Sequence, residues 1–159
     1  MTIAVIRFPG TNNENDVMRA LYSIPMGDPY LVPSSMGPEA LKKADGIVIP
    51  GGFSYGDYLR AGAVASVSSI LDGIREIADG GKPILGVCNG FQILAEAGLL
   101  PGALLPNQSA HFVCKWIYLR VAEHPTRFTN GLEDAVIRIP IAHAEGNYHC
   151  TDEDLQRLK

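Results

Sequence analysis

The stretch that most constrains this chain is a five-residue turn, Gly86-Val87-Cys88-Asn89-Gly90, between a strand pattern and a helix pattern. Residues 84–87 predict a short, fully buried strand, and the apolar residues after the turn recur at helical spacing until Gly98. Glycines are needed on both sides of so sharp a turn, since a side chain there would clash with the neighbouring strand or helix. The pattern glycine-x-nucleophile-x-glycine predicts a turn that lifts Cys88 above the carboxyl end of the strand.

Cys88 is the candidate nucleophile of this turn. A thiol at a helix N-terminus lies beside free N–H groups and the positive end of the helix dipole, which favour the reactive thiolate. The alternative is that Cys88 is a small buried hydrophobe, as isolated cysteines often are. The flanking glycines favour the nucleophile, so we expect Cys88 to be alkylated faster than Cys114 or Cys150.

The composition predicts one globular domain over residues 1–159. A chain of 159 residues with 47% hydrophobic residues can bury a full core. The net charge of −4 gives no electrostatic reason to expect a nucleic-acid partner. No apolar run approaches the roughly 20 residues of a membrane span, so we expect no membrane partner either.

The N-terminus and the cysteines predict a cytoplasmic protein. Met1 leads directly into a strand pattern, without a signal-like segment. The three cysteines have neither the spacing of a disulfide framework nor that of a zinc site. A reducing compartment fits both observations.

Short apolar runs alternate with helical patterns along the first half of the chain. In chain order, the predicted strands and helices cover residues 3–8, 14–22, 30–32, 34–41, 47–49 and 64–78. This alternation predicts an α/β fold with a parallel sheet and right-handed crossovers. The functional site of such a fold lies at the carboxyl ends of its strands, where the loops after Phe8, Ile49 and Val87 would open.

The same patterns predict the environment of individual side chains. We expect Asn13 to cap the helix over 14–22, and Val17, Ala20 and Leu21 to form its buried face. Cys114 lies in an alternating strand pattern, so we expect its thiol to be in the core.

A glycine-rich loop follows the strand predicted over 47–49. Gly51 and Gly52 at the end of a strand allow backbone N–H groups to turn toward a bound carbonyl. Together with the N–H of Asn89 they would form an oxyanion hole. An ordinary glycine-rich turn is the alternative, and a phosphate loop is disfavoured because no Gly-Lys-Ser/Thr follows.

Three segments together carry a family resemblance: PGGFSYGDYLRAGA at 50–63, GVCNGFQILAEAGLLPG at 86–102 and IPIAHAEGNYH at 139–149. They resemble the glutamine amidotransferase subunit of phosphoribosylformylglycinamidine synthase, an enzyme of de novo purine biosynthesis. The likeness runs through essentially the whole chain. It implies the three-layer α/β/α fold of the triad (class I) glutamine amidotransferases, which is flavodoxin-like with a mostly parallel central sheet.

The resemblance also implies residue roles. Cys88 would attack the side-chain amide of glutamine and become a glutamyl thioester, with Gly52 and Asn89 as oxyanion donors. Substrate-binding roles are implied for Gly51, Phe53, Gln92, Ser109, His111 and Phe112. His111 occupies a position at which relatives usually carry arginine.

The resemblance further implies partners. Ammonia released from glutamine would pass to a large, ATP-binding synthetase subunit, and a small bridging subunit is a further expected partner. ATP and magnesium are expected on that partner, and no cofactor or metal is expected in this chain.

One departure from the family concerns the catalytic base. Relatives take it from a downstream His-Pro-Glu motif, which the printed residues through Lys159 do not contain, so we expect a C-terminally truncated domain or a relative without this base. His143 and Glu145 are the alternative base and orienting carboxylate, because i, i+2 spacing on an extended segment places both on one face. The resemblance assigns their segment a supporting role instead. His149 and Cys150 could join His143 at a metal, but without a matched fourth ligand no metal site is predicted.

Two other functions remain open at this point. A non-catalytic assembly or regulatory subunit would keep the fold and lack the base. Another cysteine hydrolase of the same α/β architecture would share the turn at Cys88 but not the loop over 53–62.

Overall fold

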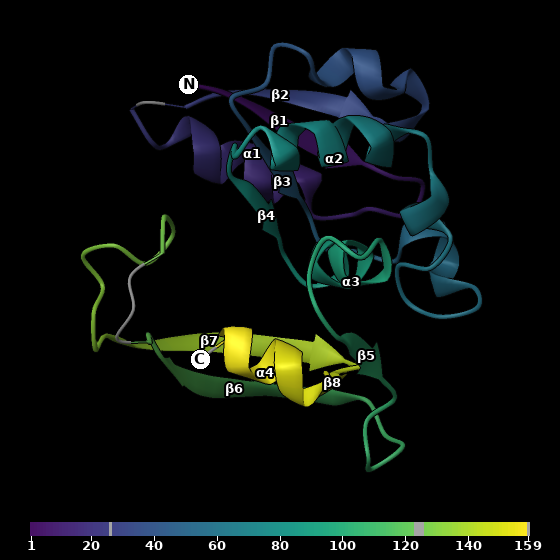
Figure 1. Ribbon diagram of the computed structural model, residues 1–159, viewed down its shortest axis with the longest axis vertical. Coiled ribbons are helices and arrows are strands. Elements are labelled where there is room, and N and C mark those ends of the chain that lie inside the picture. Colours follow the sequence, from purple (N-terminus) through teal and green to yellow (C-terminus); the bar gives the residue numbers. More distant parts are fainter. Residues whose placement is uncertain (26, 123–125, 159) are drawn as a thin grey trace. The chain divides into compact units, whose positions relative to one another are not determined.

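The computed structural model describes residues 1–25, 27–122 and 126–158 (Figure 1). The chain divides into two compact units, which we name the sheet unit (Met1–Ala103 with Cys150–Lys159) and the hairpin unit (Leu104–His149). The family resemblance and the predicted single domain span both units, and the single domain stays a prediction.

The elements alternate along the sheet unit much as the sequence predicts. Its strands and α-helices are β1 (Thr2–Arg7), α1 (Glu14–Tyr22), β2 (Asp28–Pro33), β3 (Gly46–Ile49), α2 (Ile70–Asp79), β4 (Ile84–Gly86), α3 (Asn89–Glu96) and α4 (Asp152–Leu158). Its 3₁₀ helices are η1 (Ser34–Met36), η2 (Pro38–Leu41), η3 (Ser54–Asp57) and η4 (Ala65–Val67).

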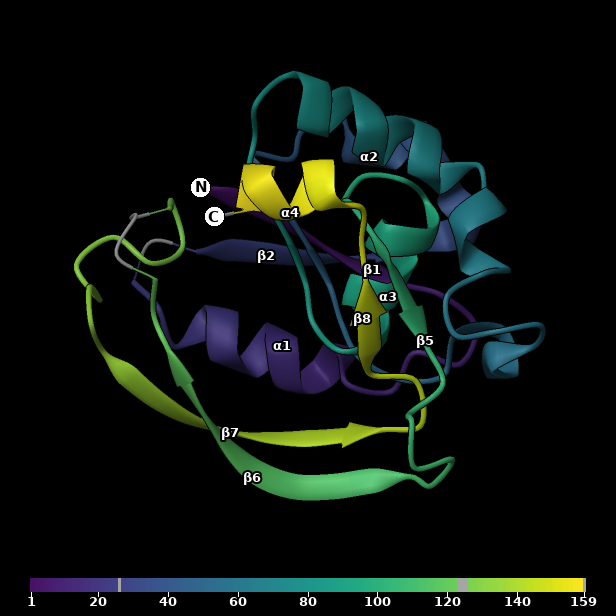
Figure 2. The same cartoon turned by 60° about the horizontal axis from the view of Figure 1, so that its bottom comes forward.

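A parallel sheet organises this unit. In the described residues it has four strands in the order β2-β1-β3-β4, and every pairing is parallel. Figure 2 shows α1 and α2 on opposite faces of the sheet. Strands covered on both faces have continuous apolar runs in their sequence. β3 is such a strand, because it is buried along its whole length. The predicted three-layer α/β/α fold is confirmed.

The core lies between the central strands and the helices that cover them. Many of its large, fully buried side chains come from β1 and the residue after it, β3, α2 and α3, and they include Ile6, Phe8, Ile47, Ile49, Ile70, Ile74 and Ile93. Because Phe8 follows β1 directly and Ile49 ends β3, the core reaches the carboxyl edge of the sheet and supports the loops there.

Two predicted helices are wrong in part. The helix expected over 64–78 begins only at Ile70, because Ser68 is extended (φ −70°, ψ 141°) and separates α2 from the short η4. Serine hydroxyls compete with helical backbone bonds, which is consistent with a break at this place. The helix expected over 34–41 is two 3₁₀ turns separated at Gly37, whose φ is 69°.

The first helix has the predicted bounds but not the predicted face. Asn13 precedes α1 without a capping hydrogen bond from its side chain, so the predicted cap is wrong. None of the helix's residues is buried: Val17 and Leu21 are half-buried and Ala20 is exposed. The helix packs on β1 and on β2, which is the outer strand of the sheet, and burial there is incomplete.

Strand β4 is less buried than predicted. Leu85 is 40% exposed and Val87, just after the strand, is 43% exposed. The expected full burial is wrong because β4 ends the strand order of the described sheet and has β3 as its neighbour there.

The hairpin unit is built on β6 (Val113–Arg120) and β7 (Val136–His143), which pair antiparallel with Val113 opposite His143. The short strands β5 (Ala103–Leu105) and β8 (Asn147–His149) pair with each other. Much of the two-stranded ribbon is exposed, and Cys114 is exposed as well, so its predicted core position is wrong. A single ribbon cannot bury both of its faces.

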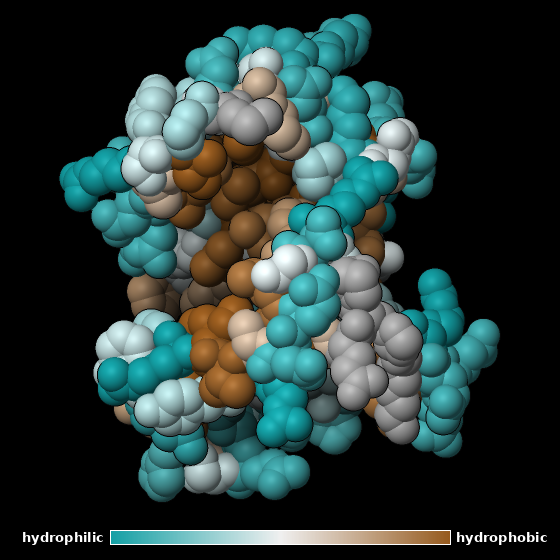
Figure 3. Space-filling model, turned by 90° about the vertical axis from the view of Figure 1, so that its left-hand side faces the viewer, coloured by the Kyte–Doolittle hydropathy of each residue, from teal (hydrophilic) through white to brown (hydrophobic). Residues whose placement is uncertain are grey.

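Apolar side chains also reach the surface of this chain. The face in Figure 3 shows hydrophobic residues beside hydrophilic ones. The exposed large apolar residues of β6 and β7 include Trp116, Tyr118, Leu119, Val136 and Ile137. None of the helices in the described part of the chain has the length and apolar character of a membrane-spanning segment.

Candidate active site

The turn between β4 and α3 has the predicted geometry. Cys88 has φ 53° and ψ −112°, a conformation that is costly for any residue with a Cβ, and its side chain is exposed. Its carbonyl oxygen accepts the N–H groups of Phe91 and Gln92 at 3.0 and 3.2 Å, so α3 starts at the cysteine. Backbone strain of this kind persists where the surrounding structure enforces it, commonly at active sites. Cys88 therefore occupies a nucleophile elbow.

The two glycines of the elbow are required by close packing. A Cβ on Gly90 would lie 2.0 Å from the carbonyl oxygen of Ile49 in β3. A Cβ on Gly86 would lie 2.7 Å from the carbonyl carbon of Gly90 in α3. The prediction that side chains at these positions would clash with the neighbouring strand and helix is confirmed.

The loops after β1, β3 and β4 meet beside Cys88. The N–H of Val87 donates to Ile49 O at 3.0 Å, and the N–H of Phe53 donates to Gly10 O at 2.9 Å. A Cβ on Gly51 would lie 3.2 Å from the Cβ of Cys88, so the glycine-rich loop passes directly by the cysteine. The predicted meeting of these loops at one edge of the sheet is confirmed.

The two backbone N–H groups predicted for an oxyanion hole make no hydrogen bond in the described part of the chain. In the described residues, neither the Gly52 N–H nor the Asn89 N–H donates to another group of the chain. Asn89 is the first residue of α3, where helices leave N–H groups free. Gly52 has φ 147°, which suits glycine and few other residues. Their role as oxyanion donors stays a prediction.

The side chain of Asn89 holds this edge together. It is 2% exposed, and its Oδ1 accepts the N–H of Ser54 at 3.0 Å. Its Nδ2 donates to Asp57 Oδ1 at 3.0 Å and to Gln92 Oε1 at 3.1 Å. The amide thus ties the glycine-rich loop to the first turn of α3. Sequence reasoning named only the backbone of Asn89 and missed this role, because its loop partners lie more than 30 positions away.

The glycine-rich loop itself is strained. Tyr55, Asp57 and Leu59 have φ values of 52°, 53° and 71°, which residues other than glycine rarely adopt. The loop's far end is fastened to α3 by Arg60, which donates to both carboxylate oxygens of Glu96 at 2.7 and 2.6 Å. Strain held by such contacts fixes the conformation of the loop next to Cys88.

We expect Asn89→Ala to reduce both stability and glutamine turnover. The substitution leaves the buried N–H of Ser54 without its partner, which costs about 1–3 kcal/mol of unfolding free energy. In a longer chain that carries the His-Pro-Glu motif, glutamate release should fall by about tenfold or more, since the loop beside Cys88 loses its anchor. Urea unfolding and glutamate release check both effects. Unchanged stability would contradict the anchoring role.

The candidate residues of the hairpin unit are organised by Asn107. Its Nδ2 donates to the carbonyl oxygens of His111 and His143 at 2.8 and 3.0 Å. Its Oδ1 accepts the Gly146 N–H at 3.0 Å and lies 2.9 Å from His143 Nδ1. Sequence reasoning named Ser109, His111 and Phe112 but did not predict this role of the Asn107 amide, whose partner His143 lies 36 positions away.

The segment after Asn107 is an exposed loop. Ser109 Oγ accepts the His111 N–H at 3.3 Å, and Ser109, His111 and Phe112 are all exposed. The structure thus leaves their side chains accessible, and their role in binding substrate stays a prediction.

His143 and Glu145 do not share a strand as predicted. β7 ends at His143, and Glu145 lies beyond the bend at Ala144, so the argument from i, i+2 spacing on an extended segment is wrong. The atom beside His143 Nδ1 is the amide oxygen of Asn107, where a carboxylate was expected. A Cβ on Gly146 would lie 2.2 Å from the His143 ring, so the backbone there packs against the imidazole. These contacts favour the supporting role, and a catalytic role stays a prediction.

The two units therefore carry different parts of the predicted site. The sheet unit holds Gly51, Gly52, Phe53, Cys88, Asn89 and Gln92. The hairpin unit holds Ser109, His111, Phe112, His143 and Glu145. Across the described residues, no group of three or more metal-ligating side chains is placed to hold an ion.

Comparison with known proteins decides the family. The model of the CobB/CobQ-like glutamine amidotransferase domain matches residues 1–159. Phosphoribosylformylglycinamidine synthase subunit PurQ of Pyrococcus furiosus is 51% identical over 156 residues, which cover 98% of this chain and 68% of that protein. The chain belongs to the PurQ family of glutamine amidotransferases. The predicted family resemblance is confirmed.

Other PurQ relatives agree. PurQ of Methanopyrus kandleri is 54% identical over 148 residues, covering 92% of this chain and 64% of that protein. The structure of PurLQS from Thermotoga maritima contains a chain with a TM-score of 0.87 and 46% identity, covering 96% of this chain and 70% of that one. The chain spans about two thirds of the length of the curated PurQ relatives it matches.

Proposed function

We propose that this chain is the glutaminase part of a phosphoribosylformylglycinamidine synthase, with Cys88 as its nucleophile. The observation that carries the proposal is Cys88 itself, exposed in a strained elbow at the start of α3 and directly beside Gly51. The PurQ family membership supports glutamine as the substrate.

The geometry supports a thioester mechanism. The sulfur of Cys88 attacks the amide carbon of the glutamine side chain, and the carbonyl oxygen takes up negative charge. The free N–H groups of Gly52 and Asn89 are candidate donors to that oxygen. The C–N bond then breaks, the nitrogen takes a proton and leaves as ammonia, and a glutamyl thioester remains.

Hydrolysis completes the cycle. Water attacks the thioester carbon, the C–S bond breaks, and glutamate and the free thiol are formed. Both the departing nitrogen and the attacking water require a proton donor or acceptor. The family resemblance implies a His-Pro-Glu motif for this task, and His143 is the alternative within this chain.

The partner follows from the same proposal. Ammonia would pass to a synthetase subunit, on which the family resemblance implies ATP and magnesium. The similar Thermotoga maritima chain belongs to a structure of PurLQS, which supports a partner subunit. A cytoplasmic location is part of the proposal, supported by three free cysteines.

Glutamine turnover tests the source of the base. Residues 1–159 should release glutamate slowly or not at all, and a longer chain that carries the His-Pro-Glu motif should release it readily, most of all with the synthetase subunit. His143→Ala should then change turnover in the longer chain by less than about tenfold. Rapid turnover by residues 1–159 that His143→Ala abolishes, with the fold intact, would show that His143 is the base.

Binding and labelling separate the alternatives. A glutamine-mimicking electrophile should modify Cys88 in the intact chain, and mass spectrometry of its peptides identifies the site. A chain that binds the synthetase subunit without labelling at Cys88 would be an assembly or regulatory subunit. A chain that labels at Cys88 but hydrolyses substrates other than glutamine would be a different cysteine hydrolase.

A further inference from the structure

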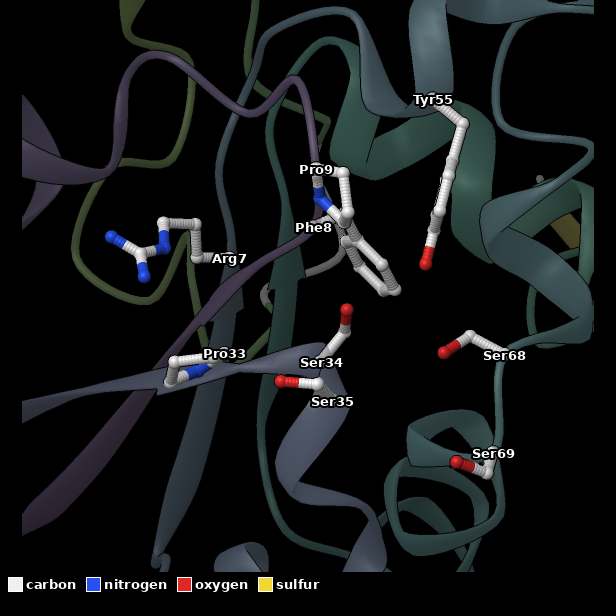
Figure 4. Close-up of a pocket in the computed structure, with 9 residues that line it drawn as sticks. All are labelled: Arg7, Phe8, Pro9, Pro33, Ser34, Ser35, Tyr55, Ser68 and Ser69. Carbon is white, nitrogen blue, oxygen red and sulfur yellow. The ribbon is translucent and has the colours of Figure 1, made fainter.

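A cavity opens at the carboxyl ends of β1 and β2, within the sheet unit. Its volume is about 350 Å³, and Cys88 is not among the residues that line it. Figure 4 shows that the lining side chains come from four separate segments of the chain: the end of β1, the end of β2, the glycine-rich loop, and the serines before α2. The proposed glutaminase chemistry makes no use of this cavity.

Three hydroxyl groups point into the cavity. Figure 4 shows Ser34 Oγ, Tyr55 OH and Ser68 Oγ converging on the same space. Ser34 is only 5% exposed, and within the described residues its hydroxyl has no hydrogen-bond partner. The hydroxyl is open to the cavity and has no partner in the part of the chain that the structure describes, so it is available to donate to a ligand there.

The backbone holds these hydroxyls in place. Tyr55 is fixed in a left-handed conformation with φ 52°, and its N–H donates to Pro9 O at 2.6 Å. Its ring packs against Phe8 with 6.4 Å between the ring centroids. Ser68 is the extended residue that separates η4 from α2, so the break in the predicted helix is what places its hydroxyl here. Such strain next to a cavity is typical of binding sites.

The charges around the cavity favour an anion. Among the described residues that line it there is no carboxylate, and Arg7 is the only charged one. The lining also includes Ser68 and Ser69, immediately before the ten-residue helix α2, whose N-terminus carries positive partial charge. In Figure 4 the Arg7 guanidinium points away from the three hydroxyls. Its charge makes the electrostatic potential at the cavity more positive without filling the space between the hydroxyls.

We propose that this cavity binds a small phosphate monoester, with Ser34, Tyr55 and Ser68 as hydrogen-bond donors to the phosphate oxygens. Hydroxyl donors, the positive end of the α2 dipole and the positive charge of Arg7 are a combination that suits phosphate. The volume is in the range of small-molecule sites and exceeds what a bare ion would need, which favours an ester.

Calorimetric titration of the full chain with glycerol phosphate tests the proposal, with inorganic phosphate and chloride at matched ionic strength for comparison. Glycerol phosphate should bind with one-to-one stoichiometry and at least about threefold more tightly than inorganic phosphate, and chloride should not bind. Ser34→Ala should weaken binding by about tenfold, the loss of one hydrogen bond to a charged group. Ser35→Ala is the matched control, since Ser35 adjoins Ser34 but its oxygen points away from the cavity in Figure 4.

The outcomes decide the proposal in either direction. Binding of glycerol phosphate no tighter than that of chloride overturns it, as does an equal loss in Ser34→Ala and Ser35→Ala. Affinity for inorganic phosphate equal to that for glycerol phosphate overturns the assignment to an ester. Ser68→Ala and Tyr55→Phe give the same test if Ser34→Ala does not fold. Cys88→Ala should bind glycerol phosphate normally, which separates this site from the proposed glutaminase.

Discussion

Cys88→Ala should abolish glutamine turnover and leave the fold intact. Without the sulfur no thioester forms, and loss of the nucleophile lowers turnover by about 10⁴-fold or more in enzymes of this kind. The Cys88 side chain is exposed, so the free energy of unfolding should change by less than about 1 kcal/mol. Glutamate release by the chain that carries its catalytic base, together with thermal unfolding, measures the two effects.

Cys114→Ala is the matched control, because Cys114 is also an exposed free cysteine but lies on β6 in the hairpin unit. It should keep full turnover and full labelling at Cys88. A large loss of stability in Cys88→Ala would instead identify Cys88 as a packing residue. Labelling of Cys114 or Cys150 in preference to Cys88 would also contradict the assignment.

Gly90→Ala should destabilise the chain more than any surface substitution. The new Cβ would lie 2.0 Å from Ile49 O and 2.7 Å from Ile49 C, and both are backbone atoms of β3 that cannot rotate away. Either β3 or α3 must shift, which breaks the hydrogen bond from the Val87 N–H to Ile49 O. We expect a loss of about 3 kcal/mol or more in the free energy of unfolding, measured by urea denaturation.

Gly80→Ala is the control for this prediction. Gly80 has φ −71°, which alanine adopts readily, and a Cβ there would lie no closer than 3.4 Å to the atoms around it. Its unfolding free energy should stay within about 1 kcal/mol of the original value. Similar losses in both variants would show that the effect at Gly90 comes from the flexibility of glycine and not from the clash with β3.

The features that the sequence determines by itself are those with local causes. The elbow at Cys88 requires glycine at positions 86 and 90, and these two glycines predict the turn from the sequence. Helix α1 has its predicted bounds, Glu14–Tyr22, because turn-forming residues precede it and its own residues favour a helix. The alternation of apolar strands and helices likewise predicts the parallel sheet, since the connections between parallel strands have a known hand and length.

Burial was decided by the tertiary structure. The apolar sequence of β4 predicts a buried central strand. β4 is partly exposed instead, because it lies at the end of the described strand order. Cys114 reads as a core residue, but a ribbon of two strands leaves it exposed. A sequence pattern states which residues can be buried, and only the neighbours of an element decide which of them are.

The polar contacts of the candidate site were also decided by the tertiary structure. Asn89 binds loop residues more than 30 positions away, and Asn107 binds residues of the 143–146 segment 36 or more positions away. The cavity at Ser34, Tyr55 and Ser68 gathers hydroxyls from three segments that share no pattern. The sequence determined the turn that holds the proposed nucleophile, because a strained turn needs particular residues at fixed spacing. The contacts around it join distant residues that only the folded chain brings within hydrogen-bonding distance.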